Sequence, residues 1–356
     1  MIGFVYDDIF LAHGVPWHPE NPRRLEVTLE HLGATGWLDR LTRLPFEAAT
    51  VGQLSWLHQP FYVEDLQEHC ASGGGSYVPD TVATEHTFEA ATMAVGGCMA
   101  AVVAALKSTG AKDDASPRQS FCLVRPPGHH ALAERPMGFC FFNNAALAAE
   151  KALREGLSRV AIVDFDVHHG NGVQEMFYDR RDVLYISLHE SGRYPGTGSL
   201  DEVGVEEGAG YTINVPLLPG ATDEHYVGAL EQVAIPALDE YKPQLLLVSA
   251  GYDAHHLDHL SYSNLTVRAY HQMTSLLAAA AAKHCEGRMV VVLEGGYHDD
   301  ALSQGIENTL RAMAGEPPSE TDDQAPQLHP DQRETIDQSL EHVVETHRTR
   351  LGLGTA

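Results

Sequence analysis

Short runs of β-branched and other apolar residues alternate along the chain with segments whose apolar residues recur at helical spacing. Several of these runs have no polar side, which is typical of strands buried on both faces of a parallel sheet. Helices between successive strands favour a single three-layer α/β domain, with a mainly parallel central sheet flanked by helices. We predict strands at residues 2–6, 121–124, 160–163, 183–188, 212–215, 245–249 and 289–293, and helices at residues 21–32, 88–106, 144–154, 223–240, 266–284 and 306–313.

Two polar segments interrupt this pattern, at residues 108–119 and 315–332, and both are predicted to be surface loops or linkers. Neither separates two self-sufficient cores. Beyond the second segment, apolar residues return near helical spacing. We therefore expect one main domain at residues 1–315, a polar linker at residues 316–332, and a C-terminal helix within residues 333–356 that packs on the same domain.

Composition and charge narrow the range of partners. Acidic residues number 49 and basic residues 23, so the formal net charge of the 356-residue chain is −26. A field of this sign repels nucleic-acid phosphates and anionic lipid surfaces. We therefore expect no nucleic-acid partner. The negative charge would attract a cationic substrate, but it is equally explained by a requirement for solubility.

Cysteine usage and the N-terminus bear on the compartment. The five cysteines are an odd number without a Cys-x-x-Cys pair, so we expect buried thiols in a reducing cytoplasm. Residues 1–7 enter a strand-like run without a basic segment before it, and the apolar stretches fall short of the ~18 residues that a membrane helix needs. The expectation is a cytoplasmic protein with no export signal and no membrane span.

Candidate chemistry follows the predicted strands. Ligands of open α/β sheets bind beyond the carboxyl ends of the strands. Four sequence-distant strand ends deliver His, Asp and Tyr to that edge: Arg125-Pro-Pro-Gly-His-His130, Asp164-Phe-Asp-Val-His-His-Gly-Asn171, Ala250-Gly-Tyr-Asp253 and Glu294-Gly-Gly-Tyr297.

Three of these residues suit a metal ion. Asp166 and His168 lie two positions apart on extended chain, so their side chains point the same way, and Asp253 adds a third ligand from another strand. An Asp-x-His pair alone is more often a helix cap or turn; the convergence of four strand ends favours the metal. Three protein ligands and an open position are typical of a catalytic metal, and this donor set suits Zn²⁺, Fe²⁺ or Mn²⁺.

Taken in order, these segments resemble the zinc-dependent histone deacetylase superfamily, on the arginase/deacetylase fold, and within it the class II-like bacterial histone deacetylase-like amidohydrolases. The resemblance covers nearly the whole chain. Besides the four strand ends, it rests on Tyr6-Asp7, His18-Pro-Glu-Asn-Pro-Arg-Arg24, Asp80-Thr81, Gly138-Phe-Cys-Phe-Phe-Asn-Asn144, Tyr194-Pro-Gly-Thr-Gly198 and Asn214-Val-Pro216. Ser187-Leu-His-Glu190, Glu294 and Asn171 look like the class II pattern.

The resemblance implies a role for each site residue. Zinc would be held by Asp166, His168 and Asp253; His129 and His130 would be the paired imidazoles, with acid/base work mainly at His130; Asp164 would orient His129; and Tyr297 would stabilise the oxyanion. Substrate would contact Gly138, Phe139, Tyr194 and Leu260 in a narrow channel, with Tyr194 replacing the usual Phe. Structural potassium would lie near Asp164, Asp166, His168, Ser187 and Leu188, and a second ion near Phe177, Arg180, Val183 and Tyr211.

The resemblance leaves three functions in competition. The first is zinc-dependent hydrolysis of N6-acetyl-lysine in proteins or peptides, with release of acetate. The second is acetylpolyamine hydrolysis, which the acidic charge would suit; an apolar Leu260, where polyamine-specific relatives place Glu, favours acetyl-lysine. The third is a noncatalytic acyl-lysine binding protein, and arginase-type chemistry ranks last because one metal site is visible. The oligomeric state remains open. The Gly-rich residues 71–78 are a candidate for the loop that narrows the channel in oligomeric relatives, or a plain surface turn.

Overall fold

The computed structural model describes residues 1–108 and 116–351. Over these residues the centre is an eight-stranded sheet in the order β2-β1-β5-β10-β9-β6-β7-β8, and all neighbouring strands in it run parallel. The prediction of a mainly parallel sheet is confirmed. The strands are β1 (Ile2–Val5), β2 (Leu41–Arg43), β5 (Gln119–Cys122), β6 (Val160–Asp164), β7 (Val183–Glu190), β8 (Thr212–Leu217), β9 (Leu245–Ala250) and β10 (Met289–Leu293).

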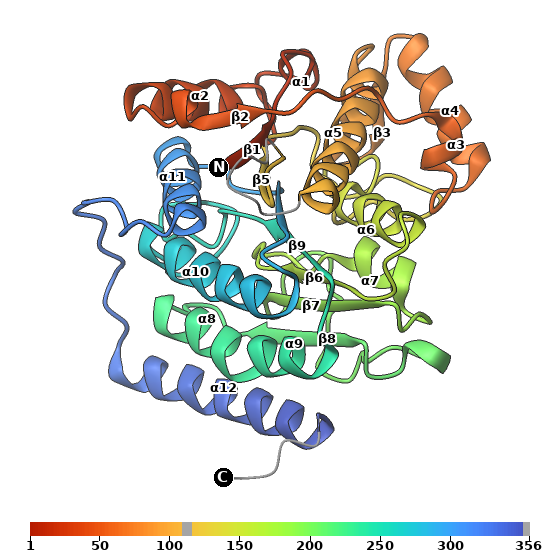
Figure 1. The fold of residues 1–356 in the computed structure, drawn as a ribbon. Helices are drawn as coiled ribbons and strands as arrows, with labels where there is room; N and C mark the ends of the chain where they lie inside the picture. The colour runs from red at the N-terminus through yellow and green to blue at the C-terminus, as the bar shows by residue number, and fades with distance from the viewer. Residues whose placement is uncertain (109–115, 352–356) are drawn as a thin grey trace.

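Helices cover both faces of the sheet (Figure 1). One layer contains α5 (Thr87–Lys107) and α6 (Asn144–Arg154), with α1 (Ile9–Ala12), α3 (Val51–Leu54), α4 (Pro60–Ala71) and α7 (Asn171–Phe177). The other contains α2 (Arg23–Ala34), α11 (Asp299–Ala314), α10 (Val267–His284), α8 (Asp223–Ala229) and α9 (Ile235–Tyr241), the last two joined by one π-helical segment (Leu230–Ala234). The expected three-layer domain is therefore present.

The sheet is central because its inner strands are apolar on both sides. Every residue of β6, β7, β9 and β10 is buried. Such strands cannot face water on either side, so they take the middle of the sheet and leave β2 and β8 as its edges. Their carboxyl ends then lie side by side.

The predicted boundaries differ from the observed ones where local chemistry decides the end of an element. The helix predicted from Asn21 begins at Arg23, and Pro22 is its N-cap. Asn21 stays outside the helix because its Oδ1 accepts the N–H of Arg23. The strand predicted at residues 121–124 lies at residues 119–122. The helix predicted from residue 306 begins at Asp299, where His298 caps it.

Some elements carry too weak a pattern to be predicted. These are the helices α1, α3, α4 and α7, the edge strand β2, and a short hairpin of β3 (Gly75–Val78) and β4 (Thr81–Ala83). The first strand of this hairpin, β3, forms the second half of the Gly-rich residues 71–78 considered above as a channel-narrowing loop. Most of the predicted loop at residues 108–119 lies outside the described residues.

The C-terminal helix α12 (Pro330–Arg350) packs on β8 and α8 (Figure 1). It begins three residues earlier than predicted because His329 caps it and Pro330 occupies its first turn. Ile336, Val343 and Val344 are buried, and Nε2 of His347 donates to the Asn214 carbonyl at 2.8 Å. Residues 315–329, between α11 and α12, form neither helix nor strand; residues 352–356 lie outside the description.

One expectation about apolar stretches was wrong. Helix α5 spans 21 residues and is apolar enough, by length and composition, to cross a membrane. Of its most apolar 18-residue window, 67% is buried inside the protein, where α5 packs on β1, β5, β10 and α6. Its apolar character therefore serves the core of the domain.

Candidate active site

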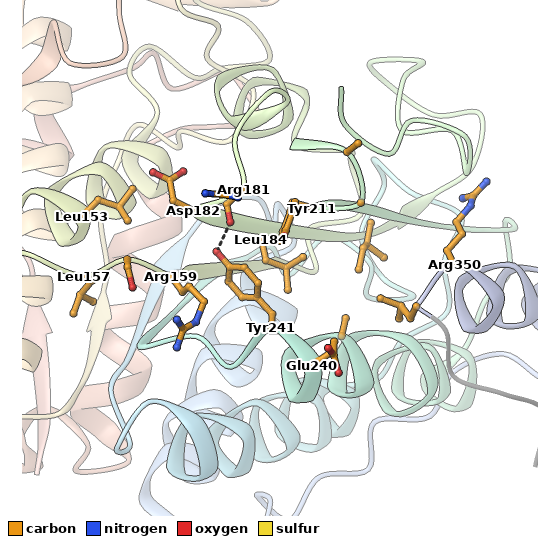
Figure 2. A pocket seen from close by; sticks show the side chains of 16 residues that line it. Leu153, Leu157, Arg159, Arg181, Asp182, Leu184, Tyr211, Glu240, Tyr241 and Arg350 are labelled. Atoms are coloured by element: carbon orange, nitrogen blue, oxygen red, sulfur yellow. Dashed lines mark hydrogen bonds between the residues drawn. The ribbon is translucent and has the colours of Figure 1, made fainter. Parts of the chain in front are cut away.

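The chemistry gathers in a small cavity at the carboxyl ends of the strands. The cavity has a volume of about 320 Å³ and is lined by Asp80, His130, Gly138, Phe139, His168, Arg193, Tyr194, His259, Leu260, Tyr262 and Tyr297. A larger cavity of about 920 Å³ lies at the opposite edge, beside residues that precede β6, β7 and β8 (Figure 2). Figure 2 shows Tyr241 there, donating to the Arg181 carbonyl at 3.0 Å. Seven predicted site residues line the smaller cavity: His130, Gly138, Phe139, His168, Tyr194, Leu260 and Tyr297.

Asp166, His168 and Asp253 converge beside this cavity. One ligand atom from each lies within 4.8 Å of the others. Nδ1 of His168 lies 3.1 Å from Oδ1 of Asp166 and 3.2 Å from Oδ2 of Asp253. Both aspartates are fully buried, at the ends of β6 and β9. The structure thus brings the three predicted ligands together.

The donor set fits a divalent cation. Although it is buried, Oδ2 of Asp253 accepts no hydrogen bond from the described residues. Burial lowers the pKa of His168, but Asp166 and Asp253 outweigh it and raise that pKa to about 10. A buried site that recruits a proton onto an imidazole has an excess of negative charge, which a divalent ion would balance.

Glycines keep the space beside these carboxylates free. A Cβ atom on Gly251 would lie 2.1 Å from Oδ2 of Asp166, and one on Gly295 would lie 2.1 Å from Oδ2 of Asp253. Real Cβ atoms do not approach so closely. The backbone of Gly295 also donates to Oδ2 of Asp166 at 2.8 Å. Gly295 therefore orients one ligand and packs directly on another.

His129 and His130 have different environments despite being adjacent. Nδ1 of His129 lies 3.1 Å from Oδ2 of Asp164, and the carboxylates of Asp166 and Asp164 raise the pKa of His129 to about 10 against the effect of burial. Burial and the neighbouring His129 hold the pKa of His130 well below its usual value. Nδ1–H of His130 donates to Oδ1 of Asn171 at 2.8 Å, which leaves Nε2 as a free acceptor. A neutral imidazole with an unprotonated Nε2 is suited to act as a general base.

Tyr297 is held by its backbone at the cavity wall. Its N–H donates to Oδ2 of Asp258 at 2.6 Å, and its ring lies edge-on to Phe139 at a centroid distance of 5.8 Å. Arg24 lies 5.0 Å from the ring centroid and donates to the carbonyls of Glu294 and Gly296, both at 2.6 Å. Burial raises the pKa of Tyr297 well above its usual value, so the phenol stays a donor at neutral pH.

The predicted substrate residues all line the cavity. Phe139 has a φ of 69°, an uncommon conformation for a bulky residue, and its N–H donates to Oγ1 of Thr81 at 3.1 Å. Tyr194 is 38% exposed, and its ring stands edge-on to His130 at 5.1 Å. Gly138 and Leu260 complete the set. The channel therefore has aromatic walls and an apolar residue on one side.

The residues predicted to bind potassium form two groups. Asp164 and Ser187 are register partners on β6 and β7, and the first group surrounds them. In the second, the Phe177 carbonyl accepts from Arg180, and the Tyr211 carbonyl accepts from Tyr185. Both ion sites stay predictions.

A second group of ligand-type residues lies in a different place. Nε2 of His255 and Nε2 of His256 lie 2.9 and 2.7 Å from the two carboxylate oxygens of Asp323. The N–H of Leu257 donates to Nδ1 of His255, so Nδ1 is an acceptor and Nε2 carries the hydrogen. In this tautomer Nε2 donates to the carboxylate and has no lone pair for a metal. The group instead ties residues 315–329 to the loop after Asp253.

Sequence reasoning assigned no role in the site to several residues that shape it. Asp258 fixes Tyr297, and Glu294 accepts the N–H groups of Gly128 and His129 at 2.7 and 3.1 Å. Burial raises the pKa of Glu294 to about 7. Arg193 adds a guanidinium to the cavity wall. The sequence marked Glu294 only through the class II pattern, and Asp258 and Arg193 only through their nearness to Asp253 and Tyr194. Contacts such as Asp258 with Tyr297 and Glu294 with Gly128 join segments that are distant in sequence.

Comparison with known proteins agrees with this geometry. A model of the histone deacetylase domain matches residues 18–313. A probable deacetylase of Archaeoglobus fulgidus is 39% identical over 318 residues, covering 88% of this chain and 86% of its own. A histone deacetylase-like amidohydrolase of Pseudomonas aeruginosa is 40% identical over 290 residues, covering 81% of this chain and 74% of its own.

A solved structure extends the match to three dimensions. The crystal structure of the HDA15 HD domain superposes with a TM-score of 0.87 at 33% identity, covering 99% of this chain and 96% of that one. Fold and site define a hydrolase of the arginase/deacetylase superfamily. Within it, this chain belongs to the histone deacetylase family and is an enzyme with deacetylase activity.

Proposed function

We propose that this deacetylase hydrolyses the N6-acetyl amide of lysine side chains in proteins or peptides, and that its metal is zinc. The observation that carries the proposal is that one small cavity brings a neutral imidazole and a protonated phenol together beside a three-ligand cluster. Asp166, His168 and Asp253 would hold the ion. When bound, zinc would supply Lewis acidity toward the amide carbonyl and toward water.

His130 would carry the proton. Its free Nε2 can accept a proton from the attacking water, and the resulting imidazolium can return it to the departing lysine amine. The hydrogen bond from Nδ1–H to Asn171 keeps this tautomer in place. His129, fixed by Asp164, would bond to the same water and hold it in line with the carbonyl.

Tyr297 would stabilise the oxyanion. Its hydroxyl keeps its proton, and its backbone is fixed by Asp258, so the donor is oriented before the reaction begins. Preorganised donors of this kind typically contribute a factor of about 10² to 10³ in rate. This role separates a catalyst from a protein that only binds acyl-lysine.

The cavity walls suit an acyl-lysine stem. Phe139 and Tyr194 would grip the four methylene groups, and the Gly138 carbonyl would accept the amide N–H. The Leu260 side chain adds apolar surface and offers an ammonium group no hydrogen-bond acceptor.

Acetylpolyamine hydrolysis is the second candidate. The net charge of −26 attracts cations, and Asp80 places a carboxylate at the cavity wall. We further propose Fe²⁺ as the alternative metal, structural potassium at the two predicted sites, and a cytoplasmic location.

Turnover with zinc tests the proposal. An acetyl-lysine peptide, acetylputrescine and acetylspermidine are compared for kcat/KM, with Tyr297→Phe as the control for contaminating activity. We expect the peptide to be cleaved fastest and the variant to lose about 10² to 10³ in kcat while it retains zinc. Faster turnover of the polyamines would favour the second candidate. A variant as active as the wild type would refute the role of Tyr297.

A further inference from the structure

The cavity wall contains a fixed cation that the reaction itself does not use. Arg193 follows β7 directly before Tyr194, and its side chain lines the cavity with 25% of its surface exposed. Among the described lining residues, Asp80 is the only carboxylate and Arg193 the only guanidinium. They are the carboxylate and the guanidinium that a substrate meets at the cavity wall.

Arg193 is held in position by three contacts. Nη2 donates to the Leu260 carbonyl at 2.8 Å, and Nε lies 3.0 Å from Oε1 of Glu190. The guanidinium also lies over the Tyr262 ring, 4.1 Å from its centroid. A side chain fixed in this way keeps its charge at one point and loses little entropy when a substrate arrives.

Glu190 does not expose its opposing charge. Its side chain has no exposed surface, and Oε2 accepts the N–H of Tyr262 at 2.9 Å and the Oγ–H of Ser263 at 3.0 Å. The carboxylate therefore lies behind the guanidinium, within the protein. A substrate meets Arg193 first.

The Asp80 carboxylate at the cavity wall already interacts with neighbouring hydroxyl groups. Its Oδ1 accepts the hydroxyl of Thr81 at 2.9 Å. Its carboxyl group also lies beside the Tyr194 hydroxyl, with which it interacts. The one lining carboxylate thus already has partners within the protein.

The two candidate substrates differ in charge at this point. In acetyl-lysine the carbon chain ends at a neutral peptide backbone, whereas in an acetylpolyamine it ends at an ammonium group. We propose that Arg193 is a specificity-determining residue, whose fixed positive charge disfavours a second cation near the scissile amide. The favoured substrates would be acetyl-lysines with neutral or acidic neighbours. This inference rests on the proposed function.

Three substrates and two arginine variants test it. The zinc-loaded chain of 356 residues is assayed for kcat/KM on acetylputrescine and on two acetyl-lysine peptides that differ only in a neighbouring Glu or Lys. Arg193→Gln removes the charge at the cavity. Arg181→Gln makes the same change at the opposite edge of the sheet, where Arg181 is 70% exposed.

We expect Arg193→Gln to raise the ratio of cationic to acidic substrate turnover by about three- to tenfold, and this effect to shrink as salt is added. Arg193→Lys keeps the charge without the guanidinium fork, so its ratio should stay within about twofold of the wild type. Arg181→Gln should leave the ratio unchanged.

An equal fall of kcat/KM for all substrates in Arg193→Gln, with an unchanged ratio, would overturn the inference and leave Arg193 as a support for Leu260. A ratio that changes as much in Arg181→Gln would also overturn it, because only net charge would then matter. A wild type inactive on all three substrates would instead refute the proposed function, and the inference with it.

Discussion

Gly295→Ala is the sharpest test of the metal site. The residue follows β10, and its φ is outside the left-handed region, so alanine fits its backbone. The added methyl would lie 2.1 Å from Oδ2 of Asp253 and 2.6 Å from Oδ2 of Asp166. The substitution therefore acts on two predicted ligands at once and keeps the hydrogen bond from the Gly295 N–H.

The size of the effect follows from these distances. Cβ contacts shorter than 3.0 Å essentially do not occur, so the Asp253 carboxylate must retreat by about 0.9 Å. A zinc–carboxylate bond is about 2.0–2.2 Å long, and a displacement of this size removes the ligand. We expect zinc affinity to fall at least about 100-fold, because disturbing outer-shell partners alone costs 10- to 100-fold. Overpacking should cost about 1–3 kcal/mol of stability.

The assay measures zinc before activity. Zinc content after dialysis and affinity by competition with a chromogenic chelator are compared with the thermal midpoint of the metal-free protein. Gly33→Ala is the matched control: Gly33 lies in α2, is exposed, and its nearest new contact would be Leu38 Cδ1 at 3.7 Å. That variant should bind zinc normally and be about as stable as the wild type or slightly more so.

Wild-type zinc affinity in Gly295→Ala would refute the reasoning, since it would mean that the carboxylates beside Gly295 are not ligands. Loss of zinc together with collapse of the metal-free fold would also contradict it, because the predicted effect is local. A parallel loss in Gly251→Ala, whose methyl would meet Asp166 at 2.1 Å, would strengthen it.

Three further predictions concern stability. Glu20→Gln should cost about 3–5 kcal/mol in denaturant unfolding, because the fully buried Arg125 would lose the carboxylate that lies 2.8 Å from its Nη2. Burial lowers the pKa of His58 from 6.5 to about 4, and its Nε2 accepts the N–H of Asn143, so the folded state resists protonation. Above pH 6.5 this ring adds no pH dependence; between pH 6.5 and 4 the unfolded chain takes up the proton first, and stability should fall by about 3 kcal/mol from this group. Ile336→Ala should destabilise the protein by about 2–4 kcal/mol in one cooperative transition if α12 belongs to the main core.

Each of these measurements has a clear contrary result. Glu155 is exposed, so Glu155→Gln should change the free energy of unfolding by less than about 0.5 kcal/mol. If Glu20→Gln lost no more stability than this control, the burial of Glu20 would be irrelevant. A His58→Gln variant with the same pH profile as the wild type would exclude His58 as the source. Unfolding of Ile336→Ala in two steps would show that α12 is a separate unit.

The strand pattern was available from the sequence because of burial. Strands covered on both faces are mostly apolar, so β6, β7, β9 and β10 begin as uninterrupted apolar runs, and polar residues appear only toward the carboxyl ends of β6, β7 and β9. Elements with exposed or short faces lack this signal, which is why the edge strand β2 and the helix α4 were not predicted.

The chemistry of the site was also readable, for a topological reason. Parallel strands deliver their carboxyl ends to one edge, so the sequence places Asp166 and Asp253 at the same edge; they meet there because β6 and β9 are neighbours in the sheet. Residue type and strand position were then sufficient to place His130 and Tyr297 in the same cavity.

Only the tertiary structure decided which side chains support that chemistry. The Asp258 contact with Tyr297, the Asn171 contact with His130 and the Glu190 contact with Arg193 each depend on the path of a loop, and loop paths carry no period. The same holds for Oδ2 of Asp253, which lies 3.2 Å from Nδ1 of His168 but accepts no hydrogen bond from the described residues. Periodicity determines which faces are buried, and strand order determines which ends meet, but side-chain partners across loops are set by packing alone.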